Sequence, residues 1–137
     1  MIDEIDLKII EELKKDSKIS NKDIGAKINM SGQAVGQRIS KLLENDVITN
    51  FTINTDNVKL GINNIAYITV YMETADHSKM KYLIEHTKEI VEAHRISGEG
   101  CYILKIESED NKIVSDLVDS INTFANYGIS TSINKLK

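Results

Sequence analysis

The spacing of apolar residues changes near residue 50, and this change divides the chain into a helical part and a part that alternates strands with helices. Isoleucines and leucines repeat with a helical period over residues 2–13, so we expect a first helix that Asp3 caps and that ends near Asp16. Two shorter helices are predicted at residues 21–28 and 31–45. A length of 137 residues suits one medium domain or two very small ones, and the change in spacing favours two.

Serine and asparagine residues mark the ends of the two shorter helices. Ser20, with Asp23 three residues later, has the pattern of a capping box, and Ser31 stands where it can cap the next helix. Asn29 lies where the chain must turn, and asparagine tolerates the left-handed conformation that ends helices. Two short helices joined by such a turn form a helix-turn-helix, whose second helix can fill a DNA major groove.

The predicted outer face of residues 31–41 suits contact with double-stranded DNA. With Val35, Ile39 and Leu42 inside, the candidate DNA-binding residues on the other side are Ser31, Gln33, Ala34, Gln37, Arg38 and Lys41. Glutamine can bond both polar atoms of the adenine edge, arginine can bond guanine or a phosphate, and alanine can touch a thymine methyl. Residues 17–43 hold five Lys and Arg against one Asp, within a chain of net charge −4. A solvated surface is the alternative interpretation, but such a surface normally mixes both signs, so the pattern favours DNA binding.

Strand patterns begin after residue 48. We expect a linking strand at residues 49–54, followed by elements in the order β-α-β-β-α-β: a strand at 65–74, a helix at 80–87, strands at 90–97 and 101–108, a helix at 113–125 and a strand at 129–134. The glycines of Gly98-Glu99-Gly100 suit a hairpin connection, and Gly128 is expected to end the last helix. This order is the ferredoxin-like arrangement.

The predicted fold class is therefore α+β. It comprises a winged-type helix-turn-helix domain at residues 1–48, a linking strand and connector at 49–61, and a ferredoxin-like βαββαβ domain at 62–137. In the strand at 65–74, one face presents Ala66, Ile68, Val70 and Met72 to the helices, and the other presents Ile65, Tyr67 and Tyr71. A sheet with helices on one side leaves that second apolar face to water, which predicts an obligate homodimer. Two-fold symmetry would pair the helix-turn-helix units.

Composition argues against several other classes. A single cysteine, Cys101, excludes a disulfide framework and a cysteine-based zinc site. His77, His86 and His94 match no compact metal motif, so we expect no catalytic residues, no metal and no cofactor. The start lacks the cationic region of a signal peptide, and the longest uncharged stretch, residues 60–72, is too short to span a membrane. The expected location is the cytoplasm, with no membrane partner.

Short motifs in a fixed order make the chain resemble a known family. They are Ile5-Asp6-Leu7-Lys8-Ile9-Ile10 with Leu13, Asp16-Ser17-Lys18-Ile19-Ser20, Met30-Ser31 followed by Val35 and Arg38-Ile39, Leu42-Leu43-Glu44 with Val47-Ile48, and Ser97-Gly98. In this order and spacing they resemble the leucine-responsive and asparagine-synthesis regulators of bacteria and archaea, the Lrp/AsnC family. The resemblance implies a transcriptional regulator whose C-terminal domain dimerises, often assembles further into an octamer or another higher oligomer, and commonly binds amino acids or related metabolites.

The resemblance also implies an effector site near the turn that follows Ser97-Gly98. The residues there are Gly98, Glu99, Gly100, Cys101 and Tyr102. The glycines permit close approach of a ligand to the backbone, and Glu99 could hold an α-ammonium group. The chain departs from the family pattern at Cys101, where an aspartate is usual, and at Asn29, where a glycine is usual. The alternative is that the glycines only shape a hairpin and that Glu99 is solvated.

Two other classes of function stay open at this point. Haem-biosynthesis decarboxylases that act on sirohaem share the two-domain layout, and Arg95 beside His94 is the hint of such an enzyme site. The second alternative is a metabolite-binding module that makes no contact with DNA.

Overall fold

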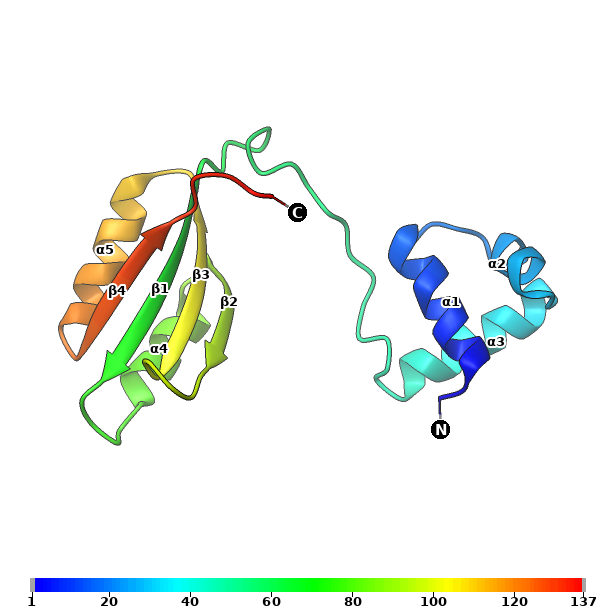
Figure 1. Cartoon of the computed structure of the whole chain (residues 1–137), viewed down its shortest axis with the longest axis horizontal. Coiled ribbons are helices and arrows are strands. Elements are labelled where there is room, and N and C mark those ends of the chain that lie inside the picture. Colours follow the sequence, from blue (N-terminus) through cyan, green and yellow to red (C-terminus); the bar gives the residue numbers. More distant parts are fainter. Residues whose placement is uncertain (1, 137) are drawn as a thin grey trace. The chain divides into compact units, whose positions relative to one another are not determined.

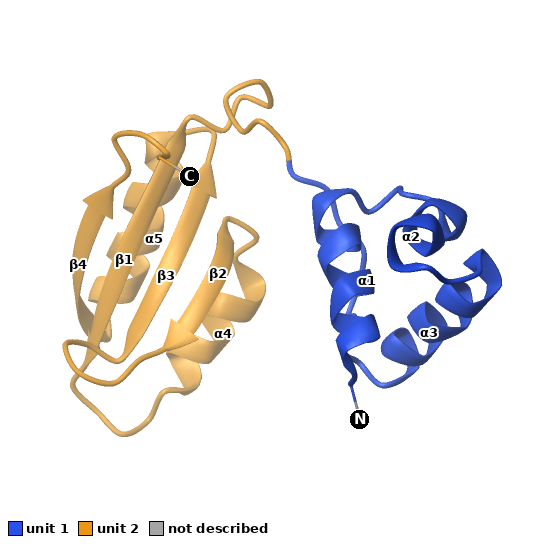
Figure 2. Ribbon diagram, turned by 45° about the vertical axis from the view of Figure 1, so that its right-hand side comes forward, with its two compact units in different colours: residues 1–54 blue, residues 55–137 orange. Residues whose placement is uncertain are grey.

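A computed structural model describes residues 2–136, which form two compact units (Figures 1 and 2). Unit 1 is Met1–Asn54 and unit 2 is Thr55–Lys137. The domain boundary expected at residue 48 stays a prediction. Within residues 2–136, no helix combines the length and the apolar character that a bilayer crossing requires.

Unit 1 contains three helices: α1 (Glu4–Lys15), α2 (Asn21–Ile28) and α3 (Gly32–Glu44). Their core is small, with Ile9, Ile24 and Val35 completely buried, one from each helix. Asp3 caps α1 as predicted, through a capping box in which Asp3 and Asp6 each accept a hydrogen bond from the other's backbone N–H. The three helices expected from the periodicity are confirmed.

The turn between α2 and α3 also follows the prediction. Asn29 ends α2 in the left-handed region, with φ 58° and ψ 47°. The Ser20 hydroxyl accepts a hydrogen bond from the Asp23 N–H and donates to the Asp23 carboxylate. The Ser31 hydroxyl accepts from the Ala34 N–H, at 3.2 Å, and begins α3. Each short helix therefore has its own cap, as the sequence predicts.

The prediction of a linking strand at residues 49–54 is wrong, and the structure shows no wing formed by this segment. Among residues 2–63 the structure has no strand. A strand is stable only when a neighbouring strand accepts and donates its backbone hydrogen bonds, and within residues 2–136 no strand pairs with this segment. Phe51 and Ile53, whose alternation suggested a strand, are exposed instead.

Unit 2 is a four-stranded antiparallel sheet with two helices. Its elements are β1 (Asn64–Met72), α4 (Ser78–His86), β2 (Ile90–Arg95), β3 (Tyr102–Ser108), α5 (Asn111–Asn122) and β4 (Ala125–Thr131). The strand order is β2-β3-β1-β4, and both helices lie on one face of the sheet (Figure 2). This confirms the ferredoxin-like arrangement.

The junction between the last helix and the last strand differs from the prediction. The helix ends at Asn122, not near Gly128, because hydrogen bonds from the N–H groups of Thr123 and Phe124 tighten its final turn. Ala125 is buried as the first residue of β4. Gly128 lies within the strand, opposite Thr69 of β1.

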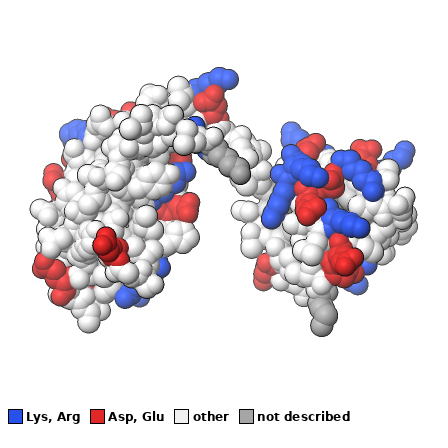
Figure 3. All heavy atoms as spheres, viewed as in Figure 1, with Lys and Arg blue, Asp and Glu red and all other residues white. Residues whose placement is uncertain are grey.

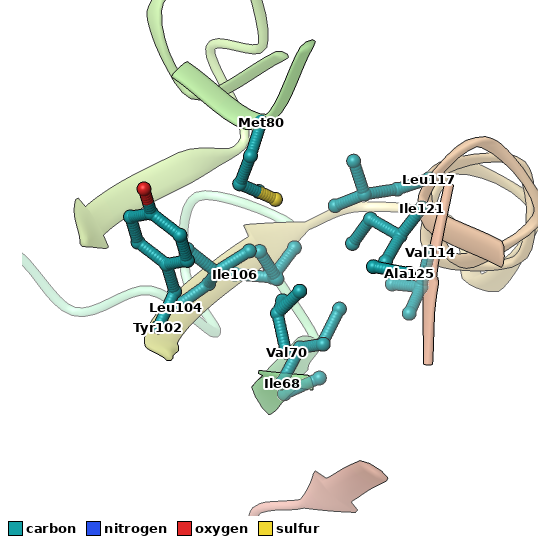
Figure 4. Packing of buried hydrophobic residues seen from close by; sticks show 11 residues of the cluster. Ile68, Val70, Met80, Tyr102, Leu104, Ile106, Val114, Leu117, Ile121 and Ala125 are labelled. Atoms are coloured by element: carbon teal, nitrogen blue, oxygen red, sulfur yellow. The ribbon is translucent and has the colours of Figure 1, made fainter. Parts of the chain in front are cut away.

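The core of unit 2 lies between the sheet and its helices (Figure 4). Side chains from β1 and β3 meet Met80 of α4 and the apolar face of α5, and the completely buried members are Ile68, Val70, Met80, Leu104, Ile106 and Ile121. On β1 the alternation is as predicted, because Tyr67 and Tyr71 are 42% and 40% exposed on the opposite face.

Candidate nucleic-acid interface

The outer face of α3 presents amides and one cation to solvent. Gln33, Gln37 and Lys41 are exposed at successive helical turns, and no acidic residue occurs in α3 before Glu44. Ala34 beside them is half-buried, with part of its methyl surface accessible. This face can donate and accept hydrogen bonds together, as adenine recognition in a major groove requires.

Two of the six predicted DNA-binding residues already have partners within the protein. The Ser31 hydroxyl accepts the capping hydrogen bond of α3. The Arg38 guanidinium donates through Nη1 to Asp3 Oδ2 at 2.8 Å and to Asp6 Oδ1 at 2.7 Å. No local sequence pattern predicts this ion pair, because Asp6 and Arg38 lie 32 residues apart in the sequence.

Electrostatics reinforces the contact of Arg38 with the start of α1. Hydrogen bonds from the Asp6 backbone N–H and from Arg38 hold the pKa of Asp3 below its ordinary value. Hydrogen bonds to Asp6 and Asp3 raise the pKa of Arg38. The Asp3 carboxylate and the Arg38 guanidinium therefore stay charged across the neutral range.

Glycines bring α2 close to α3. A Cβ on Gly32 would lie 3.1 Å from the Lys22 Cα, and a Cβ on Gly36 would lie 2.9 Å from the Asn21 Nδ2. A Cβ on Gly25, inside α2, would lie 2.3 Å from the Met30 carbonyl oxygen. The sequence analysis did not assign these glycines, although glycine in the interior of a short helix is a signal of close packing.

The cations of unit 1 divide into paired and free ones. Lys15 and Lys27 both contact Glu12, and their hydrogen bonds lower the pKa of Glu12. The hydrogen bond from Lys15 contributes the larger part of this lowering. Within residues 2–136, Lys22 and Lys41 have no carboxylate within 4 Å. Figure 3 shows Lys and Arg side chains interleaved with carboxylates over the face of unit 1 that carries α1. The surface without acidic residues is thus the part of α3 before Glu44, not unit 1 as a whole.

The hairpin of unit 2 brings together the residues of the predicted effector site. Gly98 and Gly100 have positive φ angles, 104° and 96°, and a Cβ on Gly100 would lie 2.6 Å from the Thr69 Cγ2. Glu99 is exposed between them. Cys101 is half-buried, and its N–H donates to the Val70 carbonyl at 2.7 Å. Gly100 therefore packs closely against β1, and the approach of a ligand to this backbone stays a prediction.

Tyr102 faces the core of unit 2. Its side chain is 5% exposed, and its hydroxyl lies 2.7 Å from the His77 Nδ1. The Arg95 guanidinium lies over the Tyr102 ring, 5.4 Å from its centroid. A direct contact between Tyr102 and a ligand stays a prediction.

The histidines do not form a common site. His77 contacts Tyr102, His86 stacks on Tyr82, and His94 contacts Glu92. Among residues 2–136, no three His, Cys, Asp or Glu side chains are grouped to hold a metal ion. His94 and Arg95 are adjacent in β2 and so face opposite sides of the sheet, which separates the two residues that hinted at an enzyme site.

Unit 1 is a helix-turn-helix whose outer helix has no acidic residue before Glu44, and unit 2 is a ferredoxin-like domain with a glycine hairpin. Together they define a two-domain DNA-binding regulator. The sequence-family model of the AsnC-type helix-turn-helix domain matches residues 2–43. The sequence-family model of the Lrp/AsnC ligand binding domain matches residues 65–137. The chain belongs to the Lrp/AsnC family of transcriptional regulators.

Individual relatives agree with this assignment. The chain is 37% identical to the HTH-type transcriptional regulator LrpB of Bacillus subtilis over 136 residues, which cover 99% of this chain and 91% of LrpB. It is 34% identical to LrpA of the same organism, over 98% of this chain and 100% of LrpA. The solved structure of B. subtilis LrpC has a TM-score of 0.91 and 32% identity, and it covers 100% of this chain and 98% of that one. These relatives are regulators, so the decarboxylase alternative is not supported.

Proposed function

We propose that this regulator reads double-stranded DNA with the outer face of α3. The observation that carries the proposal is the row formed by Gln33, Gln37 and Lys41, exposed at successive turns of a helix with no acid before Glu44. In a helix-turn-helix, this second helix enters the major groove and its N-terminal residues meet the base edges. Ser31 and Ala34 lie at that end, and Arg38 lies beside Gln37.

Selection of DNA from a random duplex library by the full chain tests this function. The expected result is an enriched duplex. Gln37→Ala should weaken binding to that duplex by ~1–3 kcal/mol and leave binding to a random duplex unchanged, because a lost base contact affects only the selected sequence. Lys41→Ala should weaken binding to both duplexes and flatten the salt dependence by about one unit. Lys112→Ala, a cation of α5 in unit 2, is the matched control.

Failure to enrich any duplex would contradict the function itself. Enrichment that Gln37→Ala leaves intact would contradict the assignment of α3. A regulator of this kind acts by binding, so the proposal includes no catalytic step, and it places the protein in the cytoplasm with the chromosome.

We further propose that the protein works as a homodimer and responds to a small molecule. The exposed face of β1 supports the dimer, since Tyr67 and Tyr71 lie uncovered on it. The match of residues 65–137 to a ligand-binding domain model supports an effector. A Neisseria meningitidis regulator of the same fold, at 17% identity and TM-score 0.91, was solved as a complex with L-Met, which makes amino acids the first class to test here. The hairpin around Glu99 is the proposed site.

A further inference from the structure

The start of α1 and the middle of α3 are joined by a closed network of hydrogen bonds. Asp3 N donates to Asp6 Oδ2 at 3.1 Å, and Asp6 N donates to Asp3 Oδ1 at 2.9 Å. The remaining oxygens, Asp3 Oδ2 and Asp6 Oδ1, both accept from the Arg38 Nη1. All four carboxylate oxygens are therefore used, two within the cap of α1 and two on α3.

This network crosses a part of unit 1 that apolar side chains do not fill. A hollow of about 500 Å³ lies there, and its lining includes Asp3, Asp6 and Arg38 together with Gln37 and Lys41. Among residues 2–54, three apolar side chains are completely buried, and the burial of apolar surface has little directional preference. A guanidinium fixed between two carboxylates is directional, so it constrains the orientation of α3 where the core does not.

We propose that Asp3 and Asp6 are positioning residues for DNA reading, which act by holding α3 in place through Arg38. This proposal rests on the proposed function, in which α3 reads base edges. Base contacts require side chains placed within about 0.5 Å of the productive geometry. Attraction to phosphates depends on charge and tolerates a shift of the helix. Loss of the network should therefore affect sequence reading and spare general attraction to DNA.

Positioning and charge repulsion predict opposite changes in affinity for the selected duplex when an acid of the network is neutralised. An acidic side chain beside a DNA-binding helix repels phosphates, so its neutralisation should by charge alone tighten binding to every duplex. Positioning predicts the opposite result for the selected duplex, because α3 loses its fixed orientation. Glu4 provides a matched control, since it is exposed in the first turn of α1 and does not line the hollow.

The experiment measures binding of the full chain to the selected duplex and to a random duplex of equal length, by fluorescence anisotropy over a range of salt concentrations. Asp6→Asn is expected to weaken binding to the selected duplex about fivefold or more, the scale of one lost base contact, and to leave the random duplex unchanged or slightly tighter. Arg38→Gln should give the same loss with an unchanged salt slope. Glu4→Gln should give no loss on either duplex.

Three results would overturn the proposal while the regulator function stands. The first is that Asp6→Asn and Asp3→Asn bind the selected duplex as well as Glu4→Gln does. The second is an equal loss on both duplexes, and the third is a salt slope flattened by about one unit in Arg38→Gln, which would place its guanidinium on a phosphate. If Asp6→Asn melts below the assay temperature, the binding of Asp3→Asn tests the proposal instead. This variant should stay folded, because asparagine caps a helix as well as aspartate. Failure of the wild-type chain to enrich a duplex would instead refute the function.

Discussion

Close packing at a single glycine decides how α2 meets the turn that follows it. Gly25 is buried in α2, and a side chain there would meet the backbone of Met30, which cannot rotate away. A side chain on Gly36 would meet the end of the Asn21 side chain, and that side chain can rotate away. Both glycines lie inside helices, so alanine would give each the same gain in helix propensity.

Gly25→Ala should therefore destabilise unit 1 by ~1–3 kcal/mol, the usual cost of overpacking. Gly36→Ala should be neutral or stabilising by up to ~1 kcal/mol, because propensity favours it and only a flexible side chain must move. Urea unfolding followed by circular dichroism measures both variants. Equal stability changes in the two would show that the close approach at Gly25 does not determine packing.

The ion pairs of Glu12 make the stability of unit 1 depend on pH. Hydrogen bonds from Lys15 and Lys27 lower the pKa of Glu12 in the folded chain from an ordinary value of 4.5. A carboxyl whose folded pKa is depressed stabilises the fold above its unfolded pKa, and this contribution is lost as the pH falls through the folded value. The melting temperature of the wild type should thus exceed that of Glu12→Gln at pH 7, and the difference should disappear in acid.

Thermal melts at a series of pH values from neutral to strongly acidic check this expectation. Glu11→Gln is the control, because Glu11 is exposed beside Glu12 and has no cation within 4 Å in the described chain. A difference between wild type and Glu12→Gln that persists unchanged in strong acid would contradict the assignment.

At the scale of elements, caps and periodicity predicted most of unit 1. Ser20, Asn29 and Ser31 act within three or four residues of themselves, so the sequence around each contains the information that places it. The contact of Arg38 with Asp6 could not be predicted, because nothing near either residue specifies a partner in another helix. The same reasoning explains why the exposed row of Gln33, Gln37 and Lys41 could be predicted and the ion pairs of Arg38 could not.

The failures among the strands have the same origin. Residues 49–54 have the local pattern of a strand, but strand formation depends on a neighbour that the pattern does not reveal. In unit 2 the end of α5 was predicted too late, because Phe124 and Ala125 continue the apolar period of the helix. In the structure Phe124 packs against the core from the turn after α5, and Ala125 is the first residue of β4. The predictions that failed therefore concern elements whose formation depends on residues distant in the sequence.

The hairpin between β2 and β3 gives a prediction at this scale. If an amino acid binds near Glu99, it should raise the thermal stability by mass action, by ~2.7 kcal/mol at a hundredfold excess over its dissociation constant. Glu99→Gln should reduce this shift, because the carboxylate would no longer hold the α-ammonium group. A thermal-shift screen of the proteinogenic amino acids at millimolar concentration is the measurement.

Glu109→Gln serves as the control for this screen, since Glu109 is an exposed acid just after β3. An undiminished shift in Glu99→Gln would move the site away from the hairpin. No shift with any amino acid would contradict an amino-acid effector.

For the molecule as a whole, the proposed dimer rests on the face of the sheet opposite the two helices. Along its centre β1 presents Ile65, Tyr67 and Tyr71, and Ile103 of β3 lies next to them. Lys105 and Glu107 form an ion pair on the β3 side of this apolar strip, at 2.7 Å. A face of this kind with a polar border is typical of an interface between subunits.

We expect the chain to sediment at micromolar concentration as a dimer, at twice its mass of 15.4 kDa. Tyr71→Lys should shift it to a folded monomer, because a charge within the apolar strip would be buried at the interface without a partner. Tyr82→Lys is the matched control: Tyr82 is 64% exposed on α4, on the helix side of the sheet, and its replacement should leave the dimer intact. A dimer pairs two copies of α3, so the monomeric variant should also lose affinity for a palindromic selected duplex while retaining its weaker binding to a half-site. A wild-type chain that sediments as a folded monomer would refute the dimer, and a Tyr71→Lys dimer would place the interface on another surface.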